Sequence, residues 1–432
     1  MVNFRLHVKL IDIPFHLLFL LFFLIPFGTN LISKIIILLI ISSLLFLKKK
    51  NWLNNFLLRK EYLIPSIAVY LLYSLGLLWS DNIPEALKKM EHGLSFLVFP
   101  LVLPLFDFSK KDILNLFKSF SFGCLFILIS SFLYFLYVSI THDEYIILGE
   151  IRAGDRPGNV YEYLSKHFLL VEVHRTYFSA YLLICILFVI NNFKEFSTIP
   201  FNKKNLVSIL SILTFILGLI CLQSKINIAI LFLIFIYYTV KSFKKSPILL
   251  FKVILTFATI LFLSKNIIIN RLKPMVKEIE NIISSENENE KKFTKVLQPG
   301  STETRYMLYK SSLQLIGESP ILGFGTGDLK DVLRNQNYKN NYKSIAHLNY
   351  GTHSQLLSML VSFGLLGFFV FISFFLLPLY TSIKINDSFT SFILLVLFLN
   401  CLTESFLSRQ EGIIPTVLFI TALSFSKKNN SH

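Results

Sequence analysis

The sequence predicts an all-α, polytopic integral membrane protein with about twelve membrane-spanning helices. Composition is one reason, because the 432 residues are 54% hydrophobic and only 16% charged, whereas soluble domains carry roughly 25% charged residues. The pattern is the other reason, because apolar segments of about 17 to 25 residues, long enough to cross a bilayer as a helix, alternate with short charged loops. Membrane-spanning strands would need short alternating segments, which this sequence lacks.

Twelve apolar segments are the predicted spans. They lie near residues 12–28, 31–47, 62–78, 93–106, 119–140, 176–191, 206–222, 226–240, 248–264, 355–380, 390–404 and 412–426. We therefore expect nine spans in residues 1–264, a large outer loop at 265–352 and three spans in residues 353–432. The first apolar segment lacks a small-residue cleavage site and is followed at once by a second span, so no cleavable signal peptide is expected.

Basic residues in the short loops predict the orientation of these spans, since Lys and Arg are retained on the cytoplasmic side. If the N-terminus is inside, clusters such as Lys48 to Lys50 and the pair Lys110 and Lys111 fall inside, and few basic residues fall in the short outside loops. Both termini are then cytoplasmic. The net charge of +16 is explained by anchoring at the inner face, which we favour over nucleic-acid binding.

Two longer segments, at about 141–175 and 265–352, fall on the outer side in this arrangement. Functional residues concentrate in long loops, so we expect the chemistry outside the cytoplasmic membrane. In the larger loop we predict an amphipathic helix from Arg271 and a second helix capped by Ser301 or Thr302. A short third helix is predicted over the stretch GDLKDVLRNQN.

Between the second and third of these helices, the stretch PILGFGTGDL contains three glycines, among them Gly323 and Gly325. Such a turn can bring backbone N–H groups to a phosphate at the start of a helix. Turn geometry alone is the alternative, because glycines are common in tight turns. No strand precedes this one, so a nucleotide-binding fingerprint is not expected.

The four cysteines do not indicate a metal site. Cys124, Cys185, Cys221 and Cys401 all lie within predicted spans, where a cysteine packs as a small apolar residue. No Cys and His spacing typical of a metal site is present, so we expect neither a metal nor another cofactor.

Two stretches of the chain resemble a known family. TRYMLYKSSLQLIGESPILGFGTGDL and THSQLLSMLVSFGLLG are similar to the O-antigen ligase family of polytopic membrane glycosyltransferases, which also includes lipid-linked polysaccharide polymerases. The matching residues are Arg305 with Tyr309, Pro320 with Gly323 and Gly325, and His353 with Gly364 and Gly367. VHRTYFSAYL, LQSKINIAIL and LTESFLSRQEGI also resemble segments of the family, in the same order. Tyr309 stands where the family more often has Trp, and Ser354 where it usually has Asn.

The resemblance implies that a glycan moves from a polyprenyl (undecaprenyl) diphosphate carrier to an acceptor hydroxyl, such as a lipid A core sugar, on the periplasmic face of the bacterial inner membrane. Arg305 would bind the diphosphate, because a guanidinium stays ionised and binds phosphate oxygens bidentately. His353 would be the general base, since histidine can accept a proton near neutral pH. The alternatives are an ordinary loop cation for Arg305 and a boundary histidine that caps the tenth span for His353.

Further residues are candidates for binding the substrate. Arg175, beside His174 at a membrane boundary, is the second candidate for the diphosphate, and an interfacial anchor is the alternative. The remaining substrate-binding candidates are His174, Tyr309, Gly323, Gly325 and Lys225, and Arg152, Arg156 or Arg271 could take the place of Arg175.

Three polar features are weaker candidates. Lys225 and Asn227 occupy a tight outer turn, where a lysine that extends to the interface is the alternative to a site residue. Glu404 and Arg409 flank the last outer turn, and pairing between them is the simplest expectation. The stretch WSDN at 79–82 is expected to be a structural turn.

Two other functions are alternatives. A polymerase would use the same donor with another lipid-linked repeat unit as acceptor. A transporter should show internal repeats and charged residues at mid-membrane, but the spans are nearly free of ionisable residues apart from Lys252. The expected partners are therefore the lipid-linked donor, a glycan or lipid A core acceptor and the bilayer, without nucleic acid.

Overall fold

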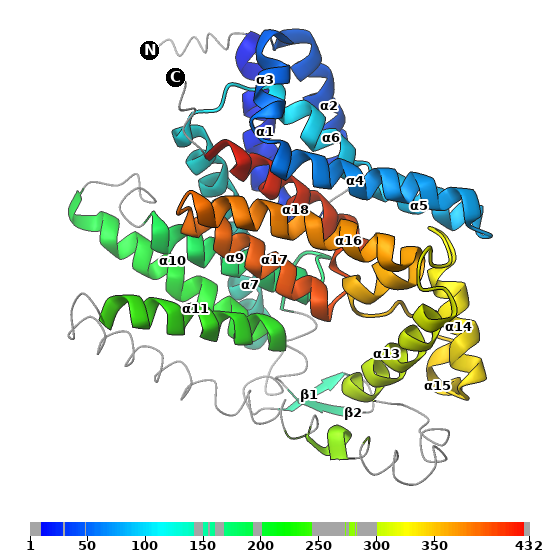
Figure 1. Ribbon diagram of the computed structural model, residues 1–432. Helices are drawn as coiled ribbons and strands as arrows, with labels where there is room; N and C mark the ends of the chain where they lie inside the picture. Colours follow the sequence, from blue (N-terminus) through cyan, green and yellow to red (C-terminus); the bar gives the residue numbers. More distant parts are fainter. Residues whose placement is uncertain are drawn as a thin grey trace.

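Figure 1 shows a computed structural model of the protein, which describes residues 10–28, 31–47, 49–141, 150–153, 156–159, 168–192, 201–243, 273, 276–280, 282 and 300–426. Among these residues the structure is helical except for one hairpin, in which β1 (Glu150–Ala153) pairs antiparallel with β2 (Arg156–Asn159). The hairpin lies in the smaller predicted outer loop, where no strand was expected. The all-α prediction is confirmed for the other elements of the described chain.

The helices divide at the large outer loop. Those before it are α1 (Ile13–Leu24), α2 (Leu31–Phe46), α3 (Trp52–Leu57), α4 (Lys60–Gly76), α5 (Ile83–Gly93), α6 (Ser95–Val102), α7 (Lys110–Thr141), α9 (Arg175–Asn191), α10 (Phe201–Leu222) and α11 (Lys225–Phe243). Those within and after it are α13 (Ser301–Glu318), α14 (Leu329–Lys339), α15 (Lys343–Ala346), α16 (Gln355–Lys384), α17 (Ser388–Thr403) and α18 (Gln410–Leu423). Short 3₁₀ turns are η1 (Leu10–Asp12), η2 (Ile25–Phe27), η3 (Lys49–Asn51), η4 (Leu77–Trp79), η5 (Leu103–Leu105), η7 (Phe406–Ser408) and η8 (Ser424–Ser426).

The number of spans predicted from hydropathy is not confirmed. In the described part of the chain, three helices are long and apolar enough to cross a membrane, namely Lys60–Trp79, Lys110–Tyr137 and Gln355–Lys384. A fourth results if the bent pair Leu31–Phe46 and Lys49–Leu57 is one span. Shorter apolar helices are Ile13–Phe27, Arg175–Asn191, Leu206–Leu222, Lys225–Val240, Ser388–Thr403 and Gln410–Ser426. The span predicted at 248–264 lies outside the described residues.

Proline and glycine account for part of this difference, because hydropathy counts apolar residues whether or not they continue a helix. The first predicted span passes into a 3₁₀ turn at Ile25 and ends at Gly28, whose φ of +61° is left-handed. The span predicted at 93–106 ends as a helix at Val102, shortly before Pro104. Proline has no backbone N–H to donate within a helix.

Helix α9 lies at the centre of the bundle. Every residue from Thr176 to Val189 is buried, and a helix that is apolar on all sides is expected in the interior of a bundle. It contacts α7, α10, α11 and α17. Helix α16 packs along α4 and α17, and Figure 1 shows α16, α17 and α18, in orange and red, lying close together across the middle of the molecule.

Helix α16 is broken at Gly364, where φ is +58° and ψ is −145°. The glycine turn of the outer loop fits into this break, because the N–H of Leu365 donates to the carbonyl of Pro320 (2.8 Å). The N–H of Gly325 donates in turn to the carbonyl of Ser362 (2.8 Å). The tenth predicted span is therefore not one continuous helix, and the loop supplies hydrogen bonds to its interrupted backbone.

The carboxylate of Asp328, which follows the glycine turn, binds the turn between α4 and α5. Asp328 accepts hydrogen bonds from the hydroxyl of Ser80 (2.6 Å) and from the backbone N–H groups of Asp81 (3.1 Å) and Asn82 (2.7 Å). The side chain of Asn82 also donates to Asp331 (2.7 Å). The stretch WSDN thus has the structural role expected for it, and Figure 1 shows α13, α14 and α15 gathered at one end of the bundle.

Candidate active site

A cavity of about 630 Å³ lies where several elements begin or end on the outer-loop side of the bundle. Its lining residues are His174, Arg175, Thr176, Gln223, Ser224, Lys225, Ile226, Ser301, Thr302, Thr304, Arg305, Tyr350, His353, Thr403 and Glu404. They come from the first turns of α9, α11 and α13, the end of α17 and the residues just before α16. Five of the eight residues proposed from sequence lie together here, namely His174, Arg175, Lys225, Arg305 and His353.

Arg305 and His353 meet at a shared carboxylate. Nη2 of Arg305 lies 2.5 Å from Oε1 of Glu404, and Nδ1 of His353 lies 3.3 Å from Oε2 of the same residue. Sequence reasoning paired Glu404 with Arg409, but in the structure the carboxylate binds Arg305 and His353 instead. The presence of a carboxylate at the end of an apolar span is the sequence feature that could have indicated Glu404 as a functional residue.

Glu404 remains a carboxylate at neutral pH. Burial alone would raise the pKa of Glu404, but the hydrogen bond from His353 and the charge of Arg305 outweigh burial and hold that pKa below its ordinary value. An ionised carboxylate only accepts hydrogen bonds, so Nδ1 of His353 must carry the hydrogen. The other ring nitrogen, Nε2, is then the one that can accept a proton.

The backbone of His353 has an unusual conformation that its surroundings maintain. Its φ of +52° lies in the left-handed region, which costs a non-glycine residue about 1 to 3 kcal/mol. The hydroxyl of Tyr309 donates to the carbonyl of His353 (3.3 Å), and the ring of Tyr350 lies edge-on to the imidazole, 5.6 Å between centroids. Tyr309, proposed from sequence as a substrate-binding residue, therefore contacts the proposed base.

Ser354 explains why the chain can depart from the family at this position. It is the N-cap of α16, and its hydroxyl accepts a hydrogen bond from the N–H of Leu357 (3.4 Å). Serine and asparagine are both among the best N-cap residues. A serine after His353 can therefore begin the helix in the way that the more usual asparagine would.

His174 caps the first turn of α9. Its Nδ1 accepts a hydrogen bond from the N–H of Thr176 (3.4 Å). Burial lowers the pKa of His174, and the effect of Glu404, which raises it, is opposed by the charge of Arg175. The imidazole is therefore neutral near pH 7, with Nδ1 as acceptor and Nε2 as donor.

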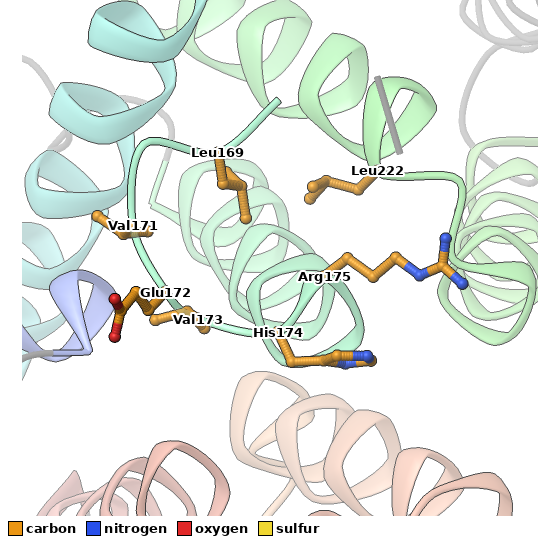
Figure 2. Close-up of a pocket in the computed structure, with 7 residues that line it drawn as sticks. All are labelled: Leu169, Val171, Glu172, Val173, His174, Arg175 and Leu222. Atoms are coloured by element: carbon orange, nitrogen blue, oxygen red, sulfur yellow. The ribbon is translucent and has the colours of Figure 1, made fainter. Parts of the chain in front are cut away.

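A second cavity, of about 360 Å³, adjoins the first and shares His174 and Arg175 with it. Figure 2 shows these two side chains at the start of α9, with the apolar side chains of Leu169, Val171 and Leu222 nearby. The two cavities thus meet at a cationic and a neutral polar side chain.

A buried amide pair is bonded to two residues that line the cavity, Thr176 and Ser224. The side-chain nitrogen of Asn227 donates to Oδ1 of Asn400 (3.1 Å), and that of Asn400 donates back to Oδ1 of Asn227 (2.9 Å). Asn227 also donates to the carbonyl of Thr176 (3.2 Å). Of the two polar residues proposed in this turn, Lys225 lines the cavity, whereas Asn227 links α9, α11 and α17.

Gly323 and Gly325 do not line this cavity. Their N–H groups donate to the carbonyls of Ser319 (3.2 Å) and Ser362 (2.8 Å), so both are engaged within the protein. Figure 1 shows the loop that carries them against α16. Of the alternatives for this turn, the structure favours turn geometry over direct phosphate contact.

The structure does not test the other arginines proposed for the diphosphate. Arg152 lies in β1 and Arg156 in β2, opposite Pro157 and Ala153 respectively. Arg271 lies outside the residues that the structure describes.

The helix that carries Arg305 begins one residue earlier than expected. Its N-cap is Gly300, not Ser301 or Thr302. The side chain of Glu303 accepts from the N–H of Gly300 (3.1 Å), and Glu278 accepts from the N–H of Thr302 (2.7 Å). Two carboxylates therefore neutralise the positive end of this helix, close to where Arg305 enters the cavity.

Comparison with known proteins supports the resemblance seen in the sequence. A protein-family model described as O-antigen ligase matches residues 206–372, a segment that includes Arg305, the glycine turn and His353 but ends before Glu404. No curated protein matches the chain. The family match confirms, over residues 206–372, the resemblance of the chain to the O-antigen ligase family.

Proposed function

We propose that the protein is a membrane glycosyltransferase that moves a glycan from a polyprenyl diphosphate carrier to an acceptor hydroxyl. The O-antigen ligase domain supports glycan transfer of the ligase or polymerase kind. The observation that carries the specific proposal is the meeting of Arg305 and His353 at Glu404 in one cavity. A phosphate-binding cation and a proton acceptor are the two groups that this reaction needs.

Arg305 stabilises the leaving group. As the glycosidic bond breaks, the diphosphate gains negative charge, and a fixed guanidinium lowers the energy of that state by several kcal/mol when water is excluded. Glu404 contacts Nη2 of Arg305, and the guanidinium has five N–H donors. Donors therefore remain for phosphate oxygens.

His353 accepts the proton of the acceptor hydroxyl. The acceptor oxygen attacks the anomeric carbon as the bond from that carbon to the phosphate oxygen breaks. The electron pair of the broken bond stays on the diphosphate, and the proton passes to Nε2 of His353. Its Nδ1 is meanwhile held by Glu404.

Arg175, His174 and Lys225 line the same cavity. We assign Arg175 as the second cation for the diphosphate, because it lies where the two cavities meet. Lys225 adds positive charge, and neutral His174 offers an N–H donor. Tyr309 acts through the backbone of His353, while Gly323 and Gly325 shape the loop that meets α16.

We place this site at the periplasmic face of the bacterial inner membrane, with both termini in the cytoplasm. Residues from predicted outer loops line the cavity that holds His353. Residues from predicted inner loops, including Lys110, Asn191, Asn192 and Asp387, line a separate cavity of about 640 Å³. The two cavities lie at opposite ends of α9, whose 17 residues make a helix about 25 Å long. This separation supports the proposed orientation.

We propose a lipid A core sugar as the acceptor, which makes the protein a ligase. The test is to delete the gene and separate the lipopolysaccharide by gel electrophoresis. A ligase predicts complete loss of long chains while carrier-linked polymer accumulates. A core that carries a single repeat unit would indicate a polymerase instead, and an unchanged lipopolysaccharide with unchanged carrier-linked polymer would contradict both.

A further inference from the structure

We propose that Glu404 is a positioning residue for glycan transfer, which fixes the tautomer and direction of His353 and at the same time holds Arg305 at the cavity wall. The inference rests on the proposed function, since it concerns how the base and the phosphate-binding cation are arranged. It assigns a role to a residue that lies outside the matched family segment and that neither touches the reacting atoms in the proposed mechanism nor pairs with Arg409.

The position of Glu404 is set by the backbone on both sides. Its N–H donates to the carbonyl of Asn400 (2.9 Å), which continues the hydrogen bonding of α17 by one residue. Its own carbonyl accepts from the N–H groups of Gln355 (3.1 Å) and Phe406 (2.7 Å). Because Gln355 begins α16, two residues after His353, the carboxylate and the imidazole are mounted on helix ends that are joined to each other.

Among the side chains of Glu404, Arg305 and His353, that of Glu404 is the least exposed. It is 17% exposed, compared with 39% for Arg305 and 35% for His353. The two more exposed groups can reach substrate in the cavity, while the carboxylate lies behind them. This ranking of exposure is expected when a less exposed carboxylate orients an imidazole whose other nitrogen accepts the proton.

The two carboxylate oxygens of Glu404 bind different partners. Oε2 accepts from Nδ1–H of His353, which selects the tautomer whose Nε2 can take a proton. Oε1 contacts Nη2 of Arg305, which restricts a long side chain that otherwise has many rotamers. A single carboxylate therefore keeps the base and the cation at a constant separation, and misplacement by about 1 Å can cost on the order of 100-fold in rate.

The test compares Glu404→Gln and Glu404→Asp with wild type, using the carrier-linked glycan that accumulates in membranes of the deletion strain as donor. Glutamine keeps the shape but loses the charge, and its amide can present N–H to Nδ1 and so favour the wrong tautomer. We expect kcat to fall by about 10²-fold to 10⁴-fold in Glu404→Gln. Binding of undecaprenyl diphosphate, measured with the purified protein in nanodiscs, should change by less than about threefold. Glu404→Asp should recover part of the lost kcat.

The pH profile separates positioning from a general structural effect. Loss of the negative charge beside His353 disfavours the imidazolium, so the acidic limb of the kcat profile should move to lower pH in Glu404→Gln. Among the described residues, the other charged or titratable side chains that face or surround His353 are Arg305, Arg175, His174, Lys225, Tyr309 and Tyr350. They are unchanged in the variant, so such a shift is attributable to Glu404.

Glu411→Gln is the matched control, because Glu411 lies in the first turn of α18 and does not line the cavity. It should leave kcat and the pH profile unchanged. Wild-type kcat with an unshifted pH profile in Glu404→Gln would overturn the inference, as would an inactive Glu404→Asp in a protein that still binds undecaprenyl diphosphate. If His353→Ala is inactive while Glu404→Gln is not, only the role of Glu404 fails. If both retain full transfer, the proposed function fails.

Discussion

At the residue scale, the candidate site has more positive than negative side chains. Among the residues that the structure describes, Arg175, Lys225 and Arg305 line the cavity together with one carboxylate, Glu404. His174 adds no full charge near neutral pH, because burial lowers its pKa. An excess of fixed positive charge in a concave site attracts anions and increases their local concentration. The charge balance therefore fits a diphosphate better than a neutral sugar alone.

Acid is expected to weaken the cluster around Glu404. Because the folded-state pKa of Glu404 lies below its ordinary value, its ionisation stabilises the folded protein above the ordinary pKa of about 4.3, and this stabilisation is lost as pH falls through the lower folded-state value. The melting temperatures of wild type and Glu404→Gln should therefore differ at neutral pH and change relative to each other below about pH 4. A difference in melting temperature between wild type and Glu404→Gln that is the same in acid and at neutral pH would contradict this prediction.

The residues of the site differ in how far the sequence could predict them. Arg305 and His353 lie in local motifs, and each is placed by the start of its own helix, which local sequence determines. Glu404 was assigned to Arg409 because the two are neighbours in sequence. Its actual partners are 99 and 51 residues away, and no local pattern records a contact over that distance.

At the element scale, the break in α16 depends on Gly364. With φ at +58°, a side chain there is strained, and a Cβ would collide with the backbone of Ile321 and Pro320. We expect Gly364→Ala to destabilise the protein by about 1 to 3 kcal/mol or more and to reduce transfer, since the outer loop can no longer fit into the helix. Thermal unfolding and transfer in membranes would be measured together.

Gly317→Ala is the control for that change. Gly317 lies in α13, and a Cβ there would meet nothing within 4 Å. Alanine in a helix is more favourable than glycine by up to about 1 kcal/mol, so this variant should be at least as stable as wild type. Equal stability and equal activity of Gly364→Ala and wild type would show that the break does not support the site.

Some helices were predicted from the sequence, whereas the break in α16 and the ends of two apolar helices were not. The sequence predicted helices close to those observed at 301–318 and 329–339. Gly317 and Pro320 mark the end of the first helix, but its predicted cap, Ser301 or Thr302, was wrong. The break at Gly364 was not predicted, because its cause is a turn more than forty residues earlier in the chain. Hydropathy also gave longer spans than the helices observed at 13–24 and 95–102, since it ignores the effect of proline on a helix.

At the scale of the whole molecule, the two ends of α9 face opposite sides of the membrane in the proposed orientation. Thr302 lines the cavity with His353, and Asn386 lines the cavity at the other end. In spheroplasts, Thr302→Cys should react with a maleimide that cannot cross membranes, and Asn386→Cys should react only after lysis. The control is the same chain with Cys221 replaced by serine, because Cys221 is partly exposed whereas Cys124, Cys185 and Cys401 are buried; both cysteine variants are made in this background. Equal labelling of both variants in intact spheroplasts would refute the proposed orientation.

The central claim is that Arg305 and His353 carry out glycan transfer, and the most direct measurement is the transfer rate of purified variants added to membranes of the deletion strain. His347→Ala and Arg334→Ala are matched controls, since His347 is exposed and bonded to the carbonyl of Lys343 and Arg334 pairs with Asp331. We predict wild-type rates for these controls, a loss on the order of 10² to 10⁴ for His353→Ala and at least about 10² for Arg305→Ala. Transfer at the wild-type rate by folded His353→Ala and Arg305→Ala proteins would contradict the account.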